Sequence, residues 1–80
     1  MEPTNDKLLV EAFAKVLRLE RRKAGFSQEE LAHLAGTSLR YISLLENCKH
    51  QPSLSTIKGL CDGLGIKMTD LISALEVELG

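Results

Sequence analysis

Apolar residues recur at helical spacing along almost the whole chain, and turn residues divide the pattern into segments. The first segment covers about residues 5–24. It carries an apolar stripe at Leu9, Phe13, Val16 and Leu17, which predicts a long amphipathic helix. No segment of useful length alternates with the period of a strand, so the pattern indicates an all-α protein.

Turn signals predict a short second helix over residues 28–35. Gly25 is typical of the left-handed residue that ends a helix, and Ser27 precedes the new segment, with Glu30 three residues later. This Ser-x-x-Glu spacing is that of a capping box, in which each side chain accepts a hydrogen bond from the other residue's main chain. Gly36 then ends the segment.

The stretch over about residues 28–47 predicts a helix-turn-helix. A residue as small as Ala32 allows two helices to approach closely, and Gly36 can adopt the left-handed conformation of a tight turn. Ile42 and Leu45, three residues apart, form the buried edge of the second helix. In such a unit, the outer face of the second helix is free to enter a DNA major groove.

A polar loop at residues 49–52 separates this unit from a fourth helix. Pro52 prevents the helix from extending backwards, and Ser53 is its predicted cap. Gly59 and Gly63 each lower helix propensity by about 1 kcal/mol relative to alanine, so we expect this helix to depend on the core. Its predicted buried face consists of Leu54, Ile57, Leu60, Cys61 and Leu64.

The last helix is predicted over about residues 70–79. Gly65 ends the preceding helix, Thr69 is the predicted cap, and Asp70 lies in the first turn, where the helix dipole favours an acid. The apolar side of this helix consists of Leu71, Ile72, Leu75 and Leu79. We therefore expect one compact five-helix domain over residues 1–80.

Composition favours a cytoplasmic protein. The chain has 80 residues, of which 44% are hydrophobic and 26% charged, as in ordinary globular domains. No apolar run approaches the roughly 18–20 residues of a membrane span, and the N-terminus lacks the layout of a secretion signal. In a chain without an export signal, the two cysteines favour reduced thiols over a disulfide framework. We therefore expect no contact with a membrane.

The net charge of −1 conceals an uneven distribution. Residues 18–58 carry seven lysines and arginines against four glutamates, a net charge of +3. Residues 59–80 carry one lysine against four acidic residues, a net charge of −3. Positive charge therefore accompanies the predicted helix-turn-helix, and such a dipolar protein can face a polyanion with one side.

An ordered set of motifs resembles the Cro/C1-type, or XRE-type, helix-turn-helix regulators. The motifs are GFSQEELA, AG, YISLLE and QPSL, followed by a leucine-rich helix that ends in LGI. The resemblance covers about residues 13–75, and the length is similar to that of phage repressors and restriction–modification controller proteins. It implies a λ-repressor-like fold and a bacterial or phage-encoded regulator that binds double-stranded DNA.

The resemblance implies that the second helix of the helix-turn-helix reads bases from its N-terminal half. With Ile42 and Leu45 turned to the core, the outward positions are Ser38, Leu39, Arg40, Ser43 and Leu44. Arg40 is the strongest candidate, because a guanidinium can donate two hydrogen bonds to guanine O6 and N7. The alternative is that Arg40 binds a phosphate, and the sequence does not distinguish these two roles.

Leu39 and Leu44 depart from the polar or basic residues that many relatives carry at these positions. A leucine cannot hydrogen-bond a base, but it can pack on a thymine methyl group. Two neighbouring exposed leucines can also form a surface for protein contact. They favour the alternative that the chain is an antitoxin or other protein-interaction module.

A second group of residues is predicted to bind phosphates. Gln28 lies at a helix N-terminus, where free N–H groups favour an anion, and the family uses a glutamine there. The full set is Ser27, Gln28, Tyr41, Asn47, Lys49, His50, Ser53 and Ser55. Capping alone also explains Ser27. For Tyr41, burial against the helix after Ser53 is the alternative.

The resemblance implies a structural salt bridge between Arg21 and Glu46 that holds the recognition helix on the first helix. By contrast, Arg18, Arg22 and Lys23 are expected to be solvated surface charges.

Cys48 stands where relatives usually have a helix-ending glycine, so we expect backbone strain or a different turn. A redox role for Cys48 is a weaker alternative.

The residues His33, Cys48, His50 and Cys61 match no zinc-ligand spacing. No phosphate-binding glycine loop or catalytic set is present in the sequence, so we expect no metal, no cofactor and no enzymatic activity.

A single small module buries only about 600–1,000 Å² on DNA, so we expect a homodimer on a palindromic operator. The apolar residues of the last helix predict the dimer interface, at Leu71, Ile72, Leu75, Val77 and Leu79.

Overall fold

The computed structural model describes residues 3–80, which fold into five helices. These are α1 (Pro3–Lys23), α2 (Gln28–Ala35), α3 (Leu39–Glu46), α4 (Leu54–Leu64) and α5 (Met68–Leu79). The all-α prediction is therefore confirmed. The bounds of α2 and α4 agree with the prediction, and the other three helices deviate by one or two residues at their ends.

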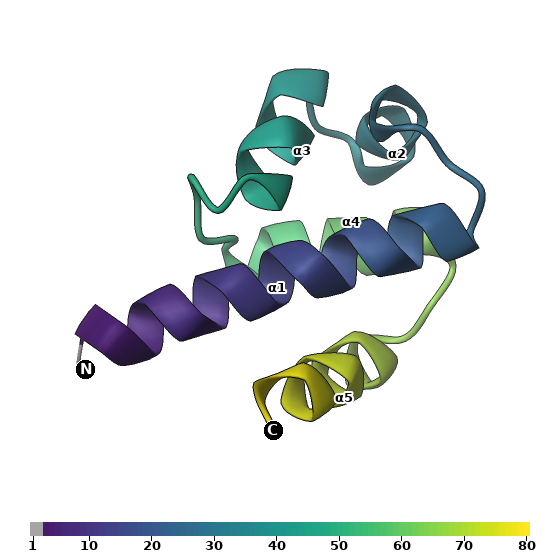
Figure 1. Ribbon diagram of the computed structural model, residues 1–80. Helices are drawn as coiled ribbons and strands as arrows, with labels where there is room; N and C mark the ends of the chain where they lie inside the picture. Colours follow the sequence, from purple (N-terminus) through teal and green to yellow (C-terminus); the bar gives the residue numbers. More distant parts are fainter. Residues whose placement is uncertain (1–2) are drawn as a thin grey trace.

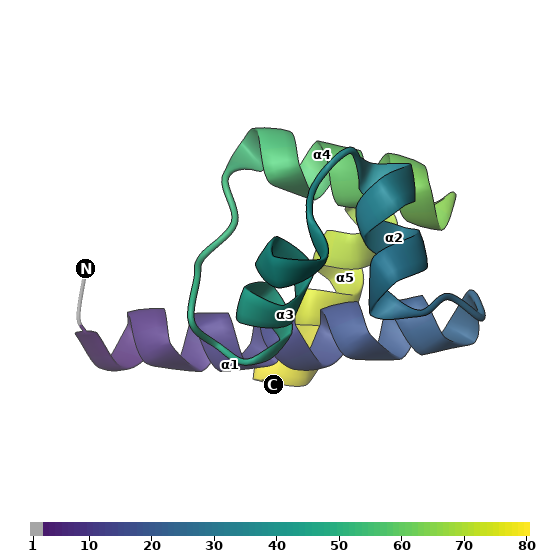
Figure 2. The ribbon, with the colours of Figure 1, turned by 90° about the horizontal axis from the view of Figure 1, so that it is seen from above.

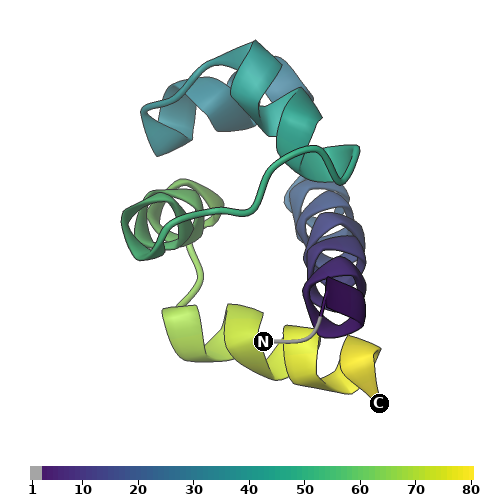
Figure 3. The ribbon, with the colours of Figure 1, turned by 90° about the vertical axis from the view of Figure 1, so that its left-hand side faces the viewer.

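The long helix α1 forms one wall of the molecule. In Figure 1, α2 and α3 lie above it, α5 lies below it and α4 lies behind it. The view of Figure 3 shows the helices enclosing a common interior, with α4 opposite α1 and with α2 and α3 opposite α5. Among residues 3–80, no helix has the length and apolarity needed to cross a membrane.

The buried core draws on all five helices. Ala32, Ile42 and Leu45, which predicted the helix-turn-helix from their spacing, are all buried in it. The core consists of Phe13, Val16, Leu17, Leu31, Ala32, Ile42, Leu45, Leu60, Cys61, Leu64 and Leu71. The platform beneath α2 and α3 is thus an ordinary apolar core.

The predicted capping box at the start of α2 is confirmed. The Ser27 hydroxyl accepts the Glu30 main-chain N–H at 3.0 Å, and the Glu30 carboxylate accepts the Ser27 N–H at 2.8 Å. Hydrogen bonds from the Ser27 main chain and then its hydroxyl hold the pKa of Glu30 below its ordinary value. Gly36 ends α2 in the left-handed conformation, with φ of 73°.

The predicted cap of α5 is wrong. Helix α5 begins at Met68, so Thr69 lies within its first turn, and the cap position is Lys67. The Asp70 carboxylate accepts the Lys67 main-chain N–H at 3.2 Å. A carboxylate that reaches back from the first turn therefore replaces the expected hydroxyl cap.

One prediction of burial and one prediction of exposure also need correction. Leu54 is 76% exposed, because it is the first residue of α4 and that end of the helix lies beyond the end of α2 (Figure 2). Leu71, expected in a dimer contact, is only 1% exposed and belongs to the core of its own chain. A side chain already enclosed by its own chain has no surface left to offer a partner.

Helix α4 approaches α2 very closely at its two glycines. A Cβ on Gly63 would lie 3.1 Å from the Ala35 main-chain nitrogen and 3.2 Å from the Leu34 carbonyl carbon. A Cβ on Gly59 would lie 3.0 Å from the Ala35 carbonyl oxygen. The residues that weaken α4 as an isolated helix therefore allow it to pack against α2.

Candidate nucleic-acid interface

A short turn joins α2 to α3. Gly36 takes the left-handed conformation there, and the Thr37 N–H donates to the Ala32 carbonyl at 2.9 Å. The Ser38 hydroxyl accepts the Tyr41 N–H at 3.1 Å and caps α3. These local hydrogen bonds set the direction in which α3 begins after the turn.

The C-terminal end of α3 is held by a buried carboxylate. The Arg21 guanidinium donates two hydrogen bonds to the Glu46 carboxylate, at 2.6 and 3.0 Å. The Glu46 side chain is only 3% exposed and that of Arg21 11%. The salt bridge that the resemblance implies is therefore present. It fixes the end of α3 to α1.

Two further side chains join this pair. The Gln28 amide donates to Glu46 Oε1 at 3.1 Å, and Arg18 Nη2 donates to the Glu46 main-chain oxygen at 2.8 Å. We call these residues the Glu46 cluster: Arg18, Arg21, Gln28 and Glu46. The expectation that Arg18 is only a solvated surface charge is wrong, because its guanidinium caps the carboxyl end of α3.

The hydrogen bonds of the cluster decide the ionisation of its carboxylate. Burial opposes the charged form of Glu46, but the hydrogen bonds from Arg21 and then Gln28 outweigh it and hold the pKa of Glu46 below its ordinary value. The hydrogen bond to Glu46 also raises the pKa of Arg21, against the opposing effect of burial. Both partners of the pair are therefore charged at neutral pH.

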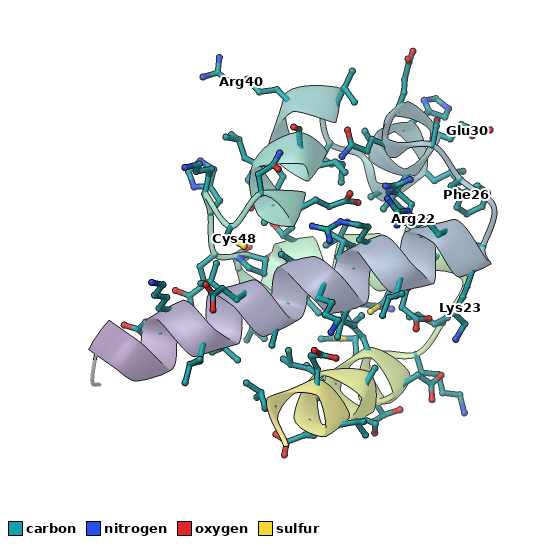
Figure 4. The ribbon with its side chains drawn as sticks, in the orientation of Figure 1. Arg22, Lys23, Phe26, Glu30, Arg40 and Cys48 are labelled. Carbon is teal, nitrogen blue, oxygen red and sulfur yellow. The ribbon has the colours of Figure 1, made fainter. Side chains whose placement is uncertain are left out.

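The opposite end of α3 is open to solvent. Ser38, Leu39 and Arg40 are exposed, whereas Ser43 and Leu44 are half-buried. The Ser43 hydroxyl also accepts a hydrogen bond from the side chain of the α3 cap residue Asn47, at 3.2 Å. Figure 4 shows Arg40 pointing away from the body of the molecule. Of the five predicted base-reading residues, the first three are therefore the most accessible.

The predicted phosphate-binding residues fall on two sides of α3. Gln28 begins α2 on one side, and the loop from Asn47 to Ser53 lies on the other (Figure 1). Lys49, His50 and Ser55 are exposed. The Ser27 and Ser53 hydroxyls both accept cap hydrogen bonds, which agrees with the structural alternative for Ser27.

Comparison with known proteins agrees with this arrangement. The model of a helix-turn-helix family, the Cro/C1 (XRE) type, matches residues 17–71. The chain belongs to this family. The control protein C.MunI from a Mycoplasma species is 34% identical over 64 residues, which cover 80% of this chain and 86% of that protein. The family consists of DNA-binding transcriptional regulators that are not enzymes.

Solved structures of controller proteins share the fold. The restriction–modification controller protein C.AhdI from Aeromonas hydrophila is 34% identical, with a TM-score of 0.75 over 78% of this chain and 94% of that chain. The controller protein C.Esp1396I, solved as a tetramer in complex with its natural 35 base-pair operator, is 22% identical. Its TM-score of 0.84 over 89% of this chain and 93% of that chain shows a common fold.

In this member of the XRE family, the turn after α3 contains a non-glycine residue in the left-handed conformation. Cys48 has φ of 61°, the only positive value for a non-glycine among residues 3–80. Cys48 therefore adopts the left-handed conformation in place of the glycine that the resemblance implies, so the expected backbone strain is present. Cys48 is exposed in the loop, whereas Cys61 is buried in α4, and burial raises the pKa of the Cys61 thiol.

The described residues bring together no cluster of three or more His, Cys, Asp or Glu side chains suited to a metal ion.

Three contacts around α3 were not predicted from the sequence. Arg18 lies three residues before Arg21, on the same helical face, and this spacing could have indicated its role. The bond between Gln28 and Glu46 spans 18 residues and had no local signal. The same holds for a ring contact between Tyr41 and His50, whose centroids lie 5.8 Å apart.

Proposed function

We propose that this regulator binds a palindromic operator as a homodimer, with α3 in the major groove. The observation that carries the proposal is the contrast along α3. Leu39 and Arg40 are exposed at its start, while the Glu46 cluster fixes its end. A rigid helix with a free N-terminal turn is the geometry with which helix-turn-helix proteins read base edges.

The surroundings of α3 support DNA as the ligand. Gln28 gives only one amide hydrogen to Glu46, so its second N–H remains able to donate to a phosphate. Lys49 is exposed in the loop on the opposite side of α3 (Figure 1), and Ser55 is exposed in the first turn of α4. Two phosphate contacts that flank the recognition helix would fix its register in the groove.

Dimerisation is proposed through α5. Ile72, Val77 and Leu79 are 40%, 81% and 44% exposed, and Leu8 of α1 is 53% exposed. Leu8 and Leu79 line the same shallow hollow between α1 and α5. A dimer would present two recognition helices to half-sites about 34 Å apart. C.Esp1396I, which shares this fold, was solved as a tetramer in complex with its operator, and this supports an oligomer on DNA.

The test begins with selection of bound duplexes from a random-sequence pool at a stated salt concentration. Arg40→Ala should weaken binding to the selected duplex by about 1–3 kcal/mol, or roughly 5- to 150-fold. Lys23→Ala is the charge-matched control, because Lys23 lies at the far end of α1 and points away from α3 (Figure 4). Equal affinities of Arg40→Ala and the wild-type protein would overturn the proposed role of α3.

The oligomeric state is tested separately by sedimentation at micromolar concentration. The wild-type chain should sediment as a dimer, and Val77→Glu should shift it towards the monomer, because a charge would be buried at the contact. A wild-type chain that remains monomeric with and without the selected duplex would contradict the dimer.

A second candidate is an antitoxin or other protein-interaction module. It is favoured by Leu39, which is 46% exposed at the start of α3. In that case, Leu39→Ala would weaken a protein complex and leave DNA affinity unchanged.

Under the first proposal, in which the protein is a DNA-bound regulator, it would act in the cytoplasm, on the nucleoid.

A further inference from the structure

An aromatic contact connects the recognition helix to the following loop. The rings of Tyr41 and His50 have centroids 5.8 Å apart and planes inclined by 35°. Tyr41 follows Arg40 directly on α3, is half-buried and packs against the core. His50 is exposed in the loop between α3 and α4. A ring anchored in the core thus supports an imidazole that stays open to solvent.

This contact limits where the imidazole can lie. A loop side chain without a neighbour would occupy several rotamers, whereas a tilted aromatic pair favours one arrangement. A protonated imidazole would also be attracted to the face of the tyrosine ring. The Tyr41 ring therefore holds His50 on the side of α3 opposite Gln28, where the proposed function has a DNA phosphate.

The charged groups around the loop leave the imidazole without an acidic partner. Lys49 precedes it, and the first turn of α4 carries no charged side chain. On α1, Asp6, Lys7 and Glu11 line a shallow hollow with Cys48 rather than with His50. None of the ion pairs found in residues 3–80 includes His50. A phosphate of bound DNA would be the first anion to reach this ring.

We propose that His50, positioned by Tyr41, is a proton-linked phosphate ligand of this regulator. The inference rests on the proposed function. Histidine is the side chain that changes charge between about pH 5 and 8, and a neighbouring phosphate favours its charged form. Operator binding therefore takes up a proton at His50, and affinity rises as the pH falls through this range.

The chain contains two histidines, which provides a matched control. His33 is also exposed, but it lies on α2 in a separate hollow lined by Phe26 and Leu34. The probe is a duplex selected from a random-sequence pool, and its affinity is measured at constant salt between about pH 5 and 8. Wild-type protein and His33→Gln should both gain about tenfold in affinity towards the lower pH, the equivalent of about 1.4 kcal/mol.

His50→Gln should bind at the highest pH nearly as well as the wild type and should lose most of the gain at lower pH. Tyr41→Phe, which keeps the ring, should retain the gain, whereas Tyr41→Ala should reduce it. The same pH dependence in His50→Gln and in the wild type would overturn this inference alone. Failure of the wild-type chain to bind any duplex at any pH would overturn the proposed function as well.

Discussion

The two sides of the helix-turn-helix differ in what holds their side chains. On the inner side, Ile42 and Leu45 are fully buried and Glu46 is 3% exposed with bonded partners. On the outer side, Leu39 is 46% exposed and Arg40 extends into solvent. The eight residues of α3 therefore serve two purposes. The inner face of α3 supplies stability, and its outer face is left free for a ligand.

The largest effect on stability is expected for Glu46→Ala, which tests the inner side. Removal of the carboxylate leaves the Arg21 guanidinium buried without its partner, which costs about 3–5 kcal/mol in comparable buried pairs. We expect a value near the lower limit, because Arg21 keeps 11% exposure. Urea unfolding followed by circular dichroism measures the loss. A loss of less than about 1 kcal/mol would show that this pair behaves like a surface salt bridge.

The same pair should respond to acid. The folded protein holds the pKa of Glu46 below its ordinary value, so the folded state binds this proton less readily than the unfolded state does. The stabilisation is therefore complete above the unfolded pKa of about 4.3 and is lost as the pH falls through the folded pKa. In urea titrations at decreasing pH, Glu46→Gln should show a smaller decline than the wild type.

Gly63→Ala tests the inner side through the packing of α4 against α2. A new Cβ would lie 3.1–3.3 Å from atoms of Ala35 and Leu34, two of them backbone atoms. We expect a net loss of about 1–2 kcal/mol in the free energy of unfolding. The exposed substitution Ser73→Ala is a suitable control. A gain of about 1 kcal/mol, as helix propensity alone predicts, would contradict the close approach.

Cys48→Gly tests the junction between the two sides. A left-handed conformation costs a non-glycine residue about 1–2 kcal/mol, so glycine should raise the thermal midpoint and stabilise the protein by about 1 kcal/mol. DNA affinity should not change. Unchanged stability would mean that the loop relaxes the φ of 61° without cost.

The smallest effect on stability is expected for Leu39→Ala. Leu39 lies on the outer side, so the free energy of unfolding should change by no more than about 0.5 kcal/mol. Sequence selection with this variant should show a weaker preference for thymine at one position if the leucine packs on a methyl group. A large loss of stability would contradict the separation of the two sides.

Local patterns accounted for much of the fold. The Ser-x-x-Glu capping box, the glycine at the α2–α3 turn and the buried pair Ile42 and Leu45 all depend on residues only a few positions apart. Such signals can be read from spacing because both partners belong to one helix or turn. The prediction that Thr69 caps α5 was wrong. The carboxylate of Asp70 accepts the Lys67 main-chain N–H instead, so the helix begins before Thr69.

The sequence by itself therefore determined the five helices, most of the core and the assignment to the XRE family. Tertiary structure alone decided the contacts between distant segments. Arg18 reaches a carbonyl 28 residues away, Gln28 a carboxylate 18 residues away, and Tyr41 the ring of His50. The physical reason is that helical periodicity specifies which face of a helix is apolar. The side chain that a polar residue meets depends on how the helices are placed in space.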